Sequence, residues 1–282
     1  MDDRLTGERP KQGATPASLL SLHDAGYGAV AAALDRSTAR LVLDIGAGEG
    51  FESVRLATRG RTVLAVDRDE GALRSASARR GSVAAGSRLA LARMDALLLA
   101  LASGSFDAVC SSHLIEHFSE PDRHVEEVAR VLSPGGTAYF LTPNAPCDFE
   151  NPFHIHLFGR AELSQTLGRY FAEVDVRGID GDERVKQDLA RRRARAERIL
   201  RLDVLGLRHR IPRSLYVYAY SRALPIAYRL LARRDGRGDS GDDGDPISEA
   251  NWFTVDQPTE ATLVLYATCR GARREGDQGL AP

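Results

Sequence analysis

Three glycines and one aspartate are the first residues in this chain whose spacing suggests chemistry. The segment LVLDIGAGEG is an apolar run that ends in Gly46, Gly48 and Gly50. Glycine lets the backbone turn sharply and lets a ligand approach without an intervening side chain. A second apolar run, VLAV, ends at Asp67. Because neighbouring parallel strands end at the same sheet edge, we expect Asp67 to accept hydrogen bonds from a ribose held over the glycine loop.

The spacing of these residues distinguishes two classes of cofactor. A dinucleotide fingerprint, GxGxxG, requires glycine at position 51, where this chain has Phe51. The pattern here is GxGxG, preceded by Asp44. An acid at that point disfavours a pyrophosphate and favours an ammonium group, so the loop favours S-adenosylmethionine (SAM). An NAD-dependent oxidoreductase is the alternative enzyme. The simpler interpretation is a tight turn, with Asp67 capping the helix that follows.

Five segments in order resemble class I SAM-dependent methyltransferases, over about residues 40 to 180 and the final strand. LDIGAGEG resembles the family's first motif, and Asp67 resembles its ribose-binding acid. The other three segments are RMDA (93–96), FDAVCSSHLIEH (106–117) and VLSPGGT (131–137). The resemblance implies that Asp95 and Ala96 hold the adenine, that His117 shapes the cofactor pocket and that Asp44 orients the ammonium through the loop or a water. The predicted cofactor-binding residues are Asp44, Gly46, Ala47, Gly48, Gly50, Asp67, Arg68, Asp95, Ala96, Ser111 and His117.

Histidines are the candidates for a base that would assist methylation of a hydroxyl group. His154 and His156 lie in NPFHIHLF, after TPN. This pattern resembles a segment of methyltransferases that act on sugars, glycolipids and related metabolites. His113 is the third candidate. The alternative is that His154 and His156 only hold their loop, through Asn144 or Glu150. A metal site is not expected, because a supporting pattern of acids is missing.

The elements around these residues predict a Rossmann-like, doubly wound α/β fold. Short apolar runs alternate with helical segments, which is typical of a parallel sheet. The predicted strands are 41–44, 63–67, 89–94, 106–110, 137–141, 172–179 and 261–269. The predicted helices are 50–59, 70–80, 121–132 and 159–170, with another starting near residue 16. The sheet is expected to have seven strands, mostly parallel, with an antiparallel last strand.

The predicted organisation has four parts. Residues 1–20 form an N-terminal tail, residues 21–180 the SAM-binding domain and residues 251–282 the final strand and C-terminal tail. Residues 181–250 form a helical insertion, with an Arg-rich helix, a Tyr-rich amphipathic stretch and a loop rich in Gly and Asp. We expect the insertion to be a lid or a dimer contact. Membrane contact is less favoured, because Pro212 and Pro225 interrupt the stretch.

Composition narrows the class of protein further. The 38 basic and 39 acidic residues leave a formal charge of −1, which gives no reason to expect nucleic-acid binding. Three scattered cysteines are typical of reduced thiols. The charged N-terminus and the lack of a long apolar run favour a cytoplasmic protein without membrane insertion. The prediction is therefore a methyltransferase for a small-molecule or glycan acceptor. Outside enzymes, the alternative is a SAM-binding partner subunit without activity.

Overall fold

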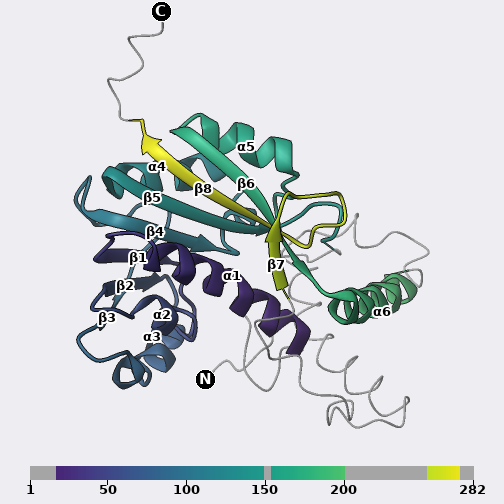
Figure 1. Cartoon of the computed structure of the whole chain (residues 1–282), viewed down its shortest axis with the longest axis horizontal. Helices are drawn as coiled ribbons and strands as arrows, with labels where there is room; N and C mark the ends of the chain where they lie inside the picture. Colours follow the sequence, from purple (N-terminus) through teal and green to yellow (C-terminus); the bar gives the residue numbers. More distant parts are fainter. Residues whose placement is uncertain (1–16, 149–153, 201–252, 274–282) are drawn as a thin grey trace, which may run out of the picture. The chain divides into compact units, whose positions relative to one another are not determined.

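The computed structural model describes residues 17–148, 154–200 and 253–273, which fall into two compact units (Figure 1). The larger unit contains residues 24–148, 155–180 and 254–273. The smaller one contains residues 17–23, His154, residues 181–200 and Phe253. The glycine loop and Asp67 both belong to the larger unit.

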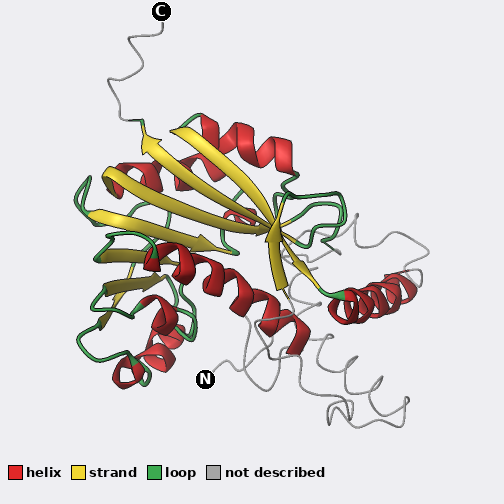
Figure 2. Ribbon diagram, in the orientation of Figure 1, coloured by secondary structure: helices red, strands yellow, loops and turns green. Residues whose placement is uncertain are grey.

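The described strands form one eight-stranded sheet in the order β3-β2-β1-β4-β5-β8-β6-β7 (Figures 1 and 2). Strands β1 to β5 pair in parallel, and β8 pairs antiparallel with both β5 and β6. This confirms the predicted α/β class and the antiparallel last strand. The strands are β1 Leu41–Ile45, β2 Thr62–Asp67, β3 Arg88–Arg93, β4 Phe106–Ser112, β5 Leu132–Pro143, β6 Phe171–Gly181, β7 Phe253–Asp256 and β8 Val264–Ala272.

Helices cover both faces of this sheet (Figure 2). In α4 the residues Val125, Val128 and Ala129 are buried, at the spacing that gives a helix one apolar stripe. The stripe packs into the main hydrophobic cluster, together with side chains from β1, β4 and β5. The helices are α1 Ala17–Asp35, α2 Ser53–Leu56, α3 Glu70–Ser77, α4 Pro121–Val131, α5 Arg160–Gly168 and α6 Glu183–Leu200, with 3₁₀ turns η1 Arg80–Ser82 and η2 Ile115–His117.

The strand order of the sheet reverses between β1 and β4. From β1 the chain adds strands in one direction through β2 and β3, and then returns to add β4 and β5 on the other side. Ligands of doubly wound sheets bind at such a reversal, beyond the carboxyl ends of the strands. Gly46 directly follows β1, and His113 directly follows β4.

Some predicted element boundaries were wrong. The helix expected over 50–59 is only the single turn α2. Gly50 and Arg59 both have a positive φ, at 72° and 52°, which a right-handed helix does not allow. The sheet has eight strands instead of seven, because β7 adds a short edge strand. Three of the four β7 residues are exposed, and the alternation Phe-Thr-Val-Asp spans only four residues, the lower limit for recognising a strand in the sequence.

The predicted Arg-rich helix is present as α6. The Asp182 side chain begins it by accepting hydrogen bonds from the amides of Arg184 and Val185, at 3.0 and 3.1 Å. Val185 and Leu189, four residues apart, are buried. The Tyr-rich stretch, the Gly/Asp-rich loop and the N-terminal tail before residue 17 lie outside the described residues.

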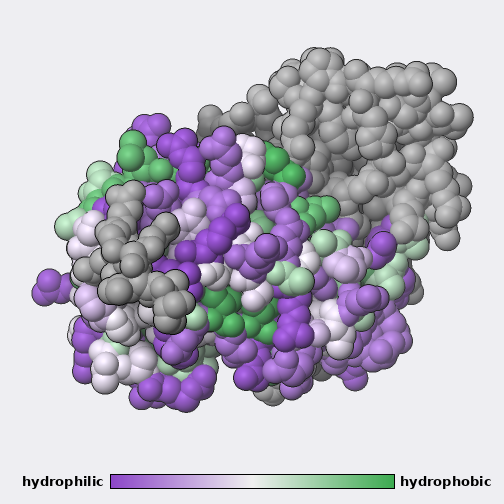
Figure 3. Space-filling model, turned by 90° about the horizontal axis from the view of Figure 1, so that it is seen from above, coloured by the Kyte–Doolittle hydropathy of each residue, from purple (hydrophilic) through white to green (hydrophobic). Residues whose placement is uncertain are grey.

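The face of the described residues that Figure 3 shows is mostly hydrophilic, with a few separate hydrophobic patches. None of the helices described is long and apolar enough to cross a bilayer. The large hydrophobic side chains that are exposed are Leu98, Ile155, Leu157 and Val255.

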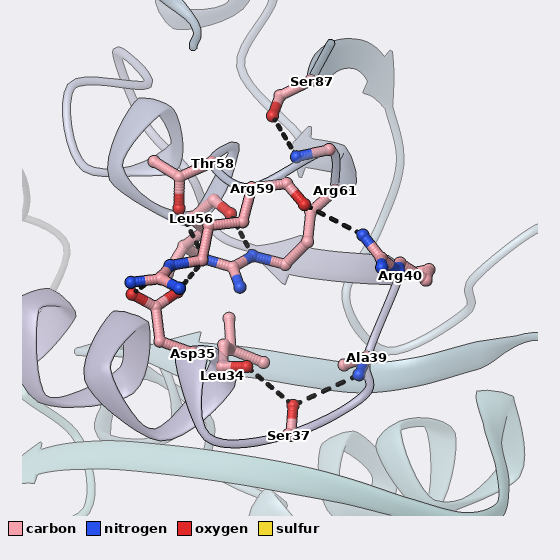
Figure 4. Close-up of polar contacts among 11 residues, drawn as sticks. Leu34, Asp35, Ser37, Ala39, Arg40, Leu56, Thr58, Arg59, Arg61 and Ser87 are labelled. Atoms are coloured by element: carbon pink, nitrogen blue, oxygen red, sulfur yellow. Dashed lines mark hydrogen bonds and ion pairs between the residues drawn. The ribbon is translucent and has the colours of Figure 1, made fainter. Parts of the chain in front are cut away.

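A polar cluster at the start of β2 connects the ends of α1 and α2 (Figure 4). The buried Arg61 side chain donates to the carbonyl of Leu56 at 2.9 Å and to Asp35 at 2.7 Å. Arg59 pairs with the same carboxylate at 2.9 Å, but its side chain is 70% exposed against 3% for Arg61. The pKa of Asp35 is lowered, chiefly by the hydrogen bond from Arg61. The two arginines therefore provide a matched pair with one shared partner.

Replacing Arg61 is expected to destabilise the fold much more than replacing Arg59. Arg61→Met removes the buried, charge-assisted hydrogen bonds to the Leu56 carbonyl and to Asp35, and should lower the free energy of unfolding by about 2–4 kcal/mol. Arg59→Met should change it by less than about 0.5 kcal/mol, because exposed ion pairs contribute little. Urea denaturation followed by circular dichroism measures both values. Equal losses would contradict this description of the cluster.

Candidate functional site

The glycine loop after β1 is fixed against the end of β2. The amides of Gly46 and Ala47 donate to the carbonyl of Val66, at 2.8 and 3.1 Å. Gly46, Gly48 and Gly50 have φ values of 77°, 53° and 72°, which residues with a side chain rarely adopt. A Cβ at position 50 would also lie 2.8 Å from the Cβ of Ala76. The loop conformation therefore requires glycine.

Asp67 ends β2 and faces this loop. One of its oxygens accepts a hydrogen bond from the Gly48 amide at 2.9 Å, and the other accepts from the Asp69 amide at 2.8 Å. The helix α3 is capped by Asp69, whose side chain accepts from the amides of Gly71 and Ala72. The simpler interpretation, in which Asp67 caps that helix, is therefore wrong.

Asp44 lies in β1 and is fully buried. Its two oxygens accept hydrogen bonds from the hydroxyls of Tyr27 at 3.1 Å and Ser53 at 2.6 Å. Burial raises the pKa of Asp44 to about 6. Burial also raises the pKa of Glu52, two residues after the last loop glycine, to about 7, with a further contribution from Asp44. The loop therefore adjoins two acids that gain negative charge near neutral pH. Glu52 was not predicted from the sequence, because an acid at a helix start usually indicates only a favourable interaction with the helix dipole.

The segment after β3 lies beside Asp67. The Met94 amide donates to the Asp67 carbonyl at 3.2 Å, and the Arg93 guanidinium donates to the Arg68 carbonyl at 3.0 Å. Asp95 is exposed and accepts from the Leu97 amide at 2.9 Å, which forms a turn. The structure thus brings the predicted ribose and adenine segments together.

Ser111 is one of the predicted cofactor-binding residues, and in the structure its side chain has a partner within the protein. It lies in β4, fully buried, and its hydroxyl is 2.8 Å from Nε2 of His124 in α4. His124 was not among the site residues predicted from the sequence. Its position next to Val125 and four residues before Val128 places it on the buried stripe of α4, and that spacing was the available signal.

His113 has an unusual backbone and an acidic neighbour. Its φ is 50°, in the left-handed region, and its amide donates to the Leu141 carbonyl at 2.8 Å. Its Nδ1 lies 3.5 Å from Oε1 of the buried Glu116, whose Oε2 accepts a hydrogen bond from the Thr142 hydroxyl at 3.1 Å. Strained residues held by their surroundings are concentrated at functional sites.

The other predicted histidines have different surroundings. His117 ends the turn η2, and its amide donates to the Leu114 carbonyl. The His156 ring is 2.7 Å from Glu162 and stacks on Phe158, with ring centres 4.3 Å apart. For the alternative in which His156 only holds its loop, the side-chain partner is Glu162 instead of Asn144, and Glu150 lies outside the described residues. His154 belongs to the smaller unit.

Sequence comparisons find methyltransferases among the known proteins that are similar to this chain. Residues 43–140 match the model of a family described as a methyltransferase domain. A probable SAM-dependent methyltransferase of Mycobacterium tuberculosis is 33% identical over 164 residues, which are 55% of this chain and 57% of that protein. A ubiquinone biosynthesis O-methyltransferase of Caulobacter is 36% identical over 105 residues, 36% of this chain and 40% of that protein. The chain therefore spans less than two thirds of either relative.

The fold has solved counterparts as well. The crystal structure of a SAM-dependent methyltransferase from Thermotoga maritima, titled as a possible histamine N-methyltransferase, has a TM-score of 0.52 at 14% identity and covers 88% of this chain and 90% of that one. At this identity the likeness concerns the fold alone. Residues 43–140 of this chain therefore match a methyltransferase domain in sequence, and the described residues share the fold of a solved SAM-dependent methyltransferase.

Proposed function

We propose that this protein binds SAM at the glycine loop and transfers its methyl group to a hydroxyl of a small-molecule or glycan acceptor. The observation that carries the proposal is the position of Asp67. Its carboxylate accepts from the Gly48 amide at the switch point of the sheet, with the buried Asp44 on the adjacent strand.

The cofactor contacts follow from this position. Each carboxylate oxygen has two lone pairs, so Asp67 can keep its two backbone donors and still accept from the ribose hydroxyls. Asp95 and Ala96 hold the adenine at the end of β3. The backbone beside the ligand comes from Gly46, Ala47, Gly48, Gly50, Arg68, Ser111 and His117. Ser111 contributes only its backbone, because its hydroxyl is bonded to His124.

Asp44 and Glu52 favour the cationic end of the cofactor through their charge. Both oxygens of Asp44 are already bonded to Tyr27 and Ser53, so it acts through the loop or a water instead of touching the ammonium. A positive ligand nearby stabilises the ionised form of a buried acid. Binding of the cofactor therefore releases protons from this pair.

His113 is the proposed base among the three candidates. SAM supplies a methyl group bonded to a positively charged sulfur. Most of the protein's contribution to the transfer is the alignment of this methyl group with the acceptor. The Glu116 carboxylate lies 3.5 Å from Nδ1 of His113. Nε2 would take the proton that the acceptor hydroxyl loses when SAM gives up its methyl group and leaves as neutral S-adenosylhomocysteine. His156 is bound to Glu162 and is less suited to this role.

The proposed acceptor class rests on two observations. The TPN segment at 142–144 and the NPFHIHLF segment at 151–158 resemble methyltransferases that act on sugars and glycolipids. One relative is named as an O-methyltransferase of ubiquinone biosynthesis. We further propose that residues 181–250 cover the acceptor or join two copies of the chain.

Turnover tests the proposed activity directly. The purified chain is incubated with SAM and a panel of sugars, phenols and quinols, and S-adenosylhomocysteine and the methylated product are measured by mass spectrometry. Methyl transfer to a hydroxyl supports the proposal. Cofactor binding without transfer to any acceptor of the panel would favour the non-catalytic partner subunit.

Cofactor affinity is expected to increase with pH. Asp44 and Glu52 have pKa values of about 6 and about 7 in the free protein, and the ammonium favours their ionised forms. The Kd for S-adenosylhomocysteine should therefore fall about tenfold from about pH 5 to about pH 8. Asp44→Asn should flatten most of this dependence, which calorimetry at several pH values measures. An unchanged slope in Asp44→Asn would contradict the assignment.

Replacing His113 should slow transfer without weakening cofactor binding. We choose His113→Asn, because asparagine tolerates the left-handed backbone and cannot act as the base. The kcat should fall about 100-fold or more, while the Kd for S-adenosylhomocysteine changes by less than about threefold. Glu116→Gln should give an intermediate loss. If His156→Gln causes the loss and His113→Asn does not, the base is His156.

A further inference from the structure

His124 is a fully buried histidine whose two ring nitrogens both have partners. Nε2 lies 2.8 Å from the Ser111 hydroxyl in β4, and Nδ1 lies 3.1 Å from the carbonyl oxygen of Ala96, after β3. The rings of Phe118 and Phe140 pack against it, with centres 5.0 and 6.1 Å away. One side chain of α4 therefore joins the ends of two strands.

The partners determine which nitrogen carries the proton. A carbonyl oxygen can only accept, so Nδ1–H donates to Ala96. Burial lowers the pKa of His124 to about 4, although the charges of Glu116 and Glu127 oppose this effect. The ring is therefore neutral near pH 7, and Nε2 accepts from the Ser111 hydroxyl. A single tautomer satisfies both contacts.

The same side of α4 also holds the rest of this loop. Glu127 accepts from the Leu99 amide at 2.6 Å. Arg130 donates to the carbonyls of Leu99 and Leu101, at 2.9 and 2.8 Å. His124, Glu127 and Arg130 are spaced by three residues, so they lie along one side of the helix. Of these three residues, His124 contacts the part of the loop next to Asp95.

We propose that His124 is a positioning residue for adenine recognition: by holding the Ala96 carbonyl, it fixes the backbone that Asp95 and Ala96 present to the edge of the base. The inference rests on the proposed binding of SAM at the glycine loop. The hydrogen bond from the Leu97 amide to the Asp95 side chain also restricts the rotation of this backbone. Without the bond to His124, the peptide groups around Ala96 can rotate away from the base.

The test compares two ligands that differ only in the base. Calorimetry gives the Kd of S-adenosylhomocysteine and of S-inosylhomocysteine for the full chain and for His124→Phe, which keeps an aromatic ring between Phe118 and Phe140. The wild-type chain should prefer adenine. The preference, expressed as the ratio of the two Kd values, should fall about five- to tenfold in His124→Phe.

Arg61→Met is the matched control, because it also removes a buried hydrogen-bonded side chain but lies at the opposite end of β2 from Asp67. It should lower the melting temperature and keep the preference for adenine. An unchanged ratio in His124→Phe, or an equal fall in Arg61→Met, overturns the positioning role. A wild-type chain that binds neither ligand overturns the proposed function and this inference together. A wild-type chain that binds and discriminates, beside an unchanged His124→Phe, refutes only the inference.

A second measurement uses the wild-type chain and does not depend on the folding of a variant. Nitrogen-15 spectra of the histidine rings report the tautomer directly. The expected result is a neutral ring with the proton on Nδ1 at pH 7 and a shift of this resonance when S-adenosylhomocysteine binds. A ring protonated on Nε2, or a resonance that the ligand leaves unchanged, overturns the proposal.

Discussion

The hydrogen bonds of Asp67 connect the parts of the site to one another. Its carboxylate accepts from the glycine loop, and its backbone carbonyl accepts from Met94, where β3 leaves the sheet. Both contacts depend on the parallel pairing of β2 with β1 and β3. One residue therefore aligns the loop, the proposed ribose position and the segment proposed to hold adenine. A shift in the register of β2 would displace all three.

The charges of the site depend on burial as much as on residue type. Asp44 has two hydroxyl donors, but its burial still raises its pKa to about 6, and Glu52 follows at about 7. In the same unit, burial keeps His124 neutral. The site thus combines acids that a bound cation would ionise with a histidine that acts only through hydrogen bonds. Desolvation raises the pKa of an acid and lowers that of a base, which explains both behaviours.

Sequence patterns predicted the parts of the site that depend on strand ends. The apolar runs before Gly46 and Asp67 were enough to place these residues together, because parallel pairing fixes where strands end. The role of His124 depends on contacts with Ser111 and Ala96, residues 13 and 28 positions away, which periodicity does not reveal. The contact between His156 and Glu162 was missed for a similar reason, since it crosses the start of α5. The strand β7 alternates apolar and polar residues over only four positions, which is too short a run to predict a strand with any weight.

Calorimetric titration with S-adenosylhomocysteine and, separately, with NADH tests the central claim most directly. The claim is that the glycine loop and Asp67 form a nucleoside site for SAM. We expect micromolar binding of S-adenosylhomocysteine alone, lost in Asp67→Ala while the variant stays folded by circular dichroism. Binding of NADH instead, or unchanged binding of S-adenosylhomocysteine in Asp67→Ala, would contradict the account.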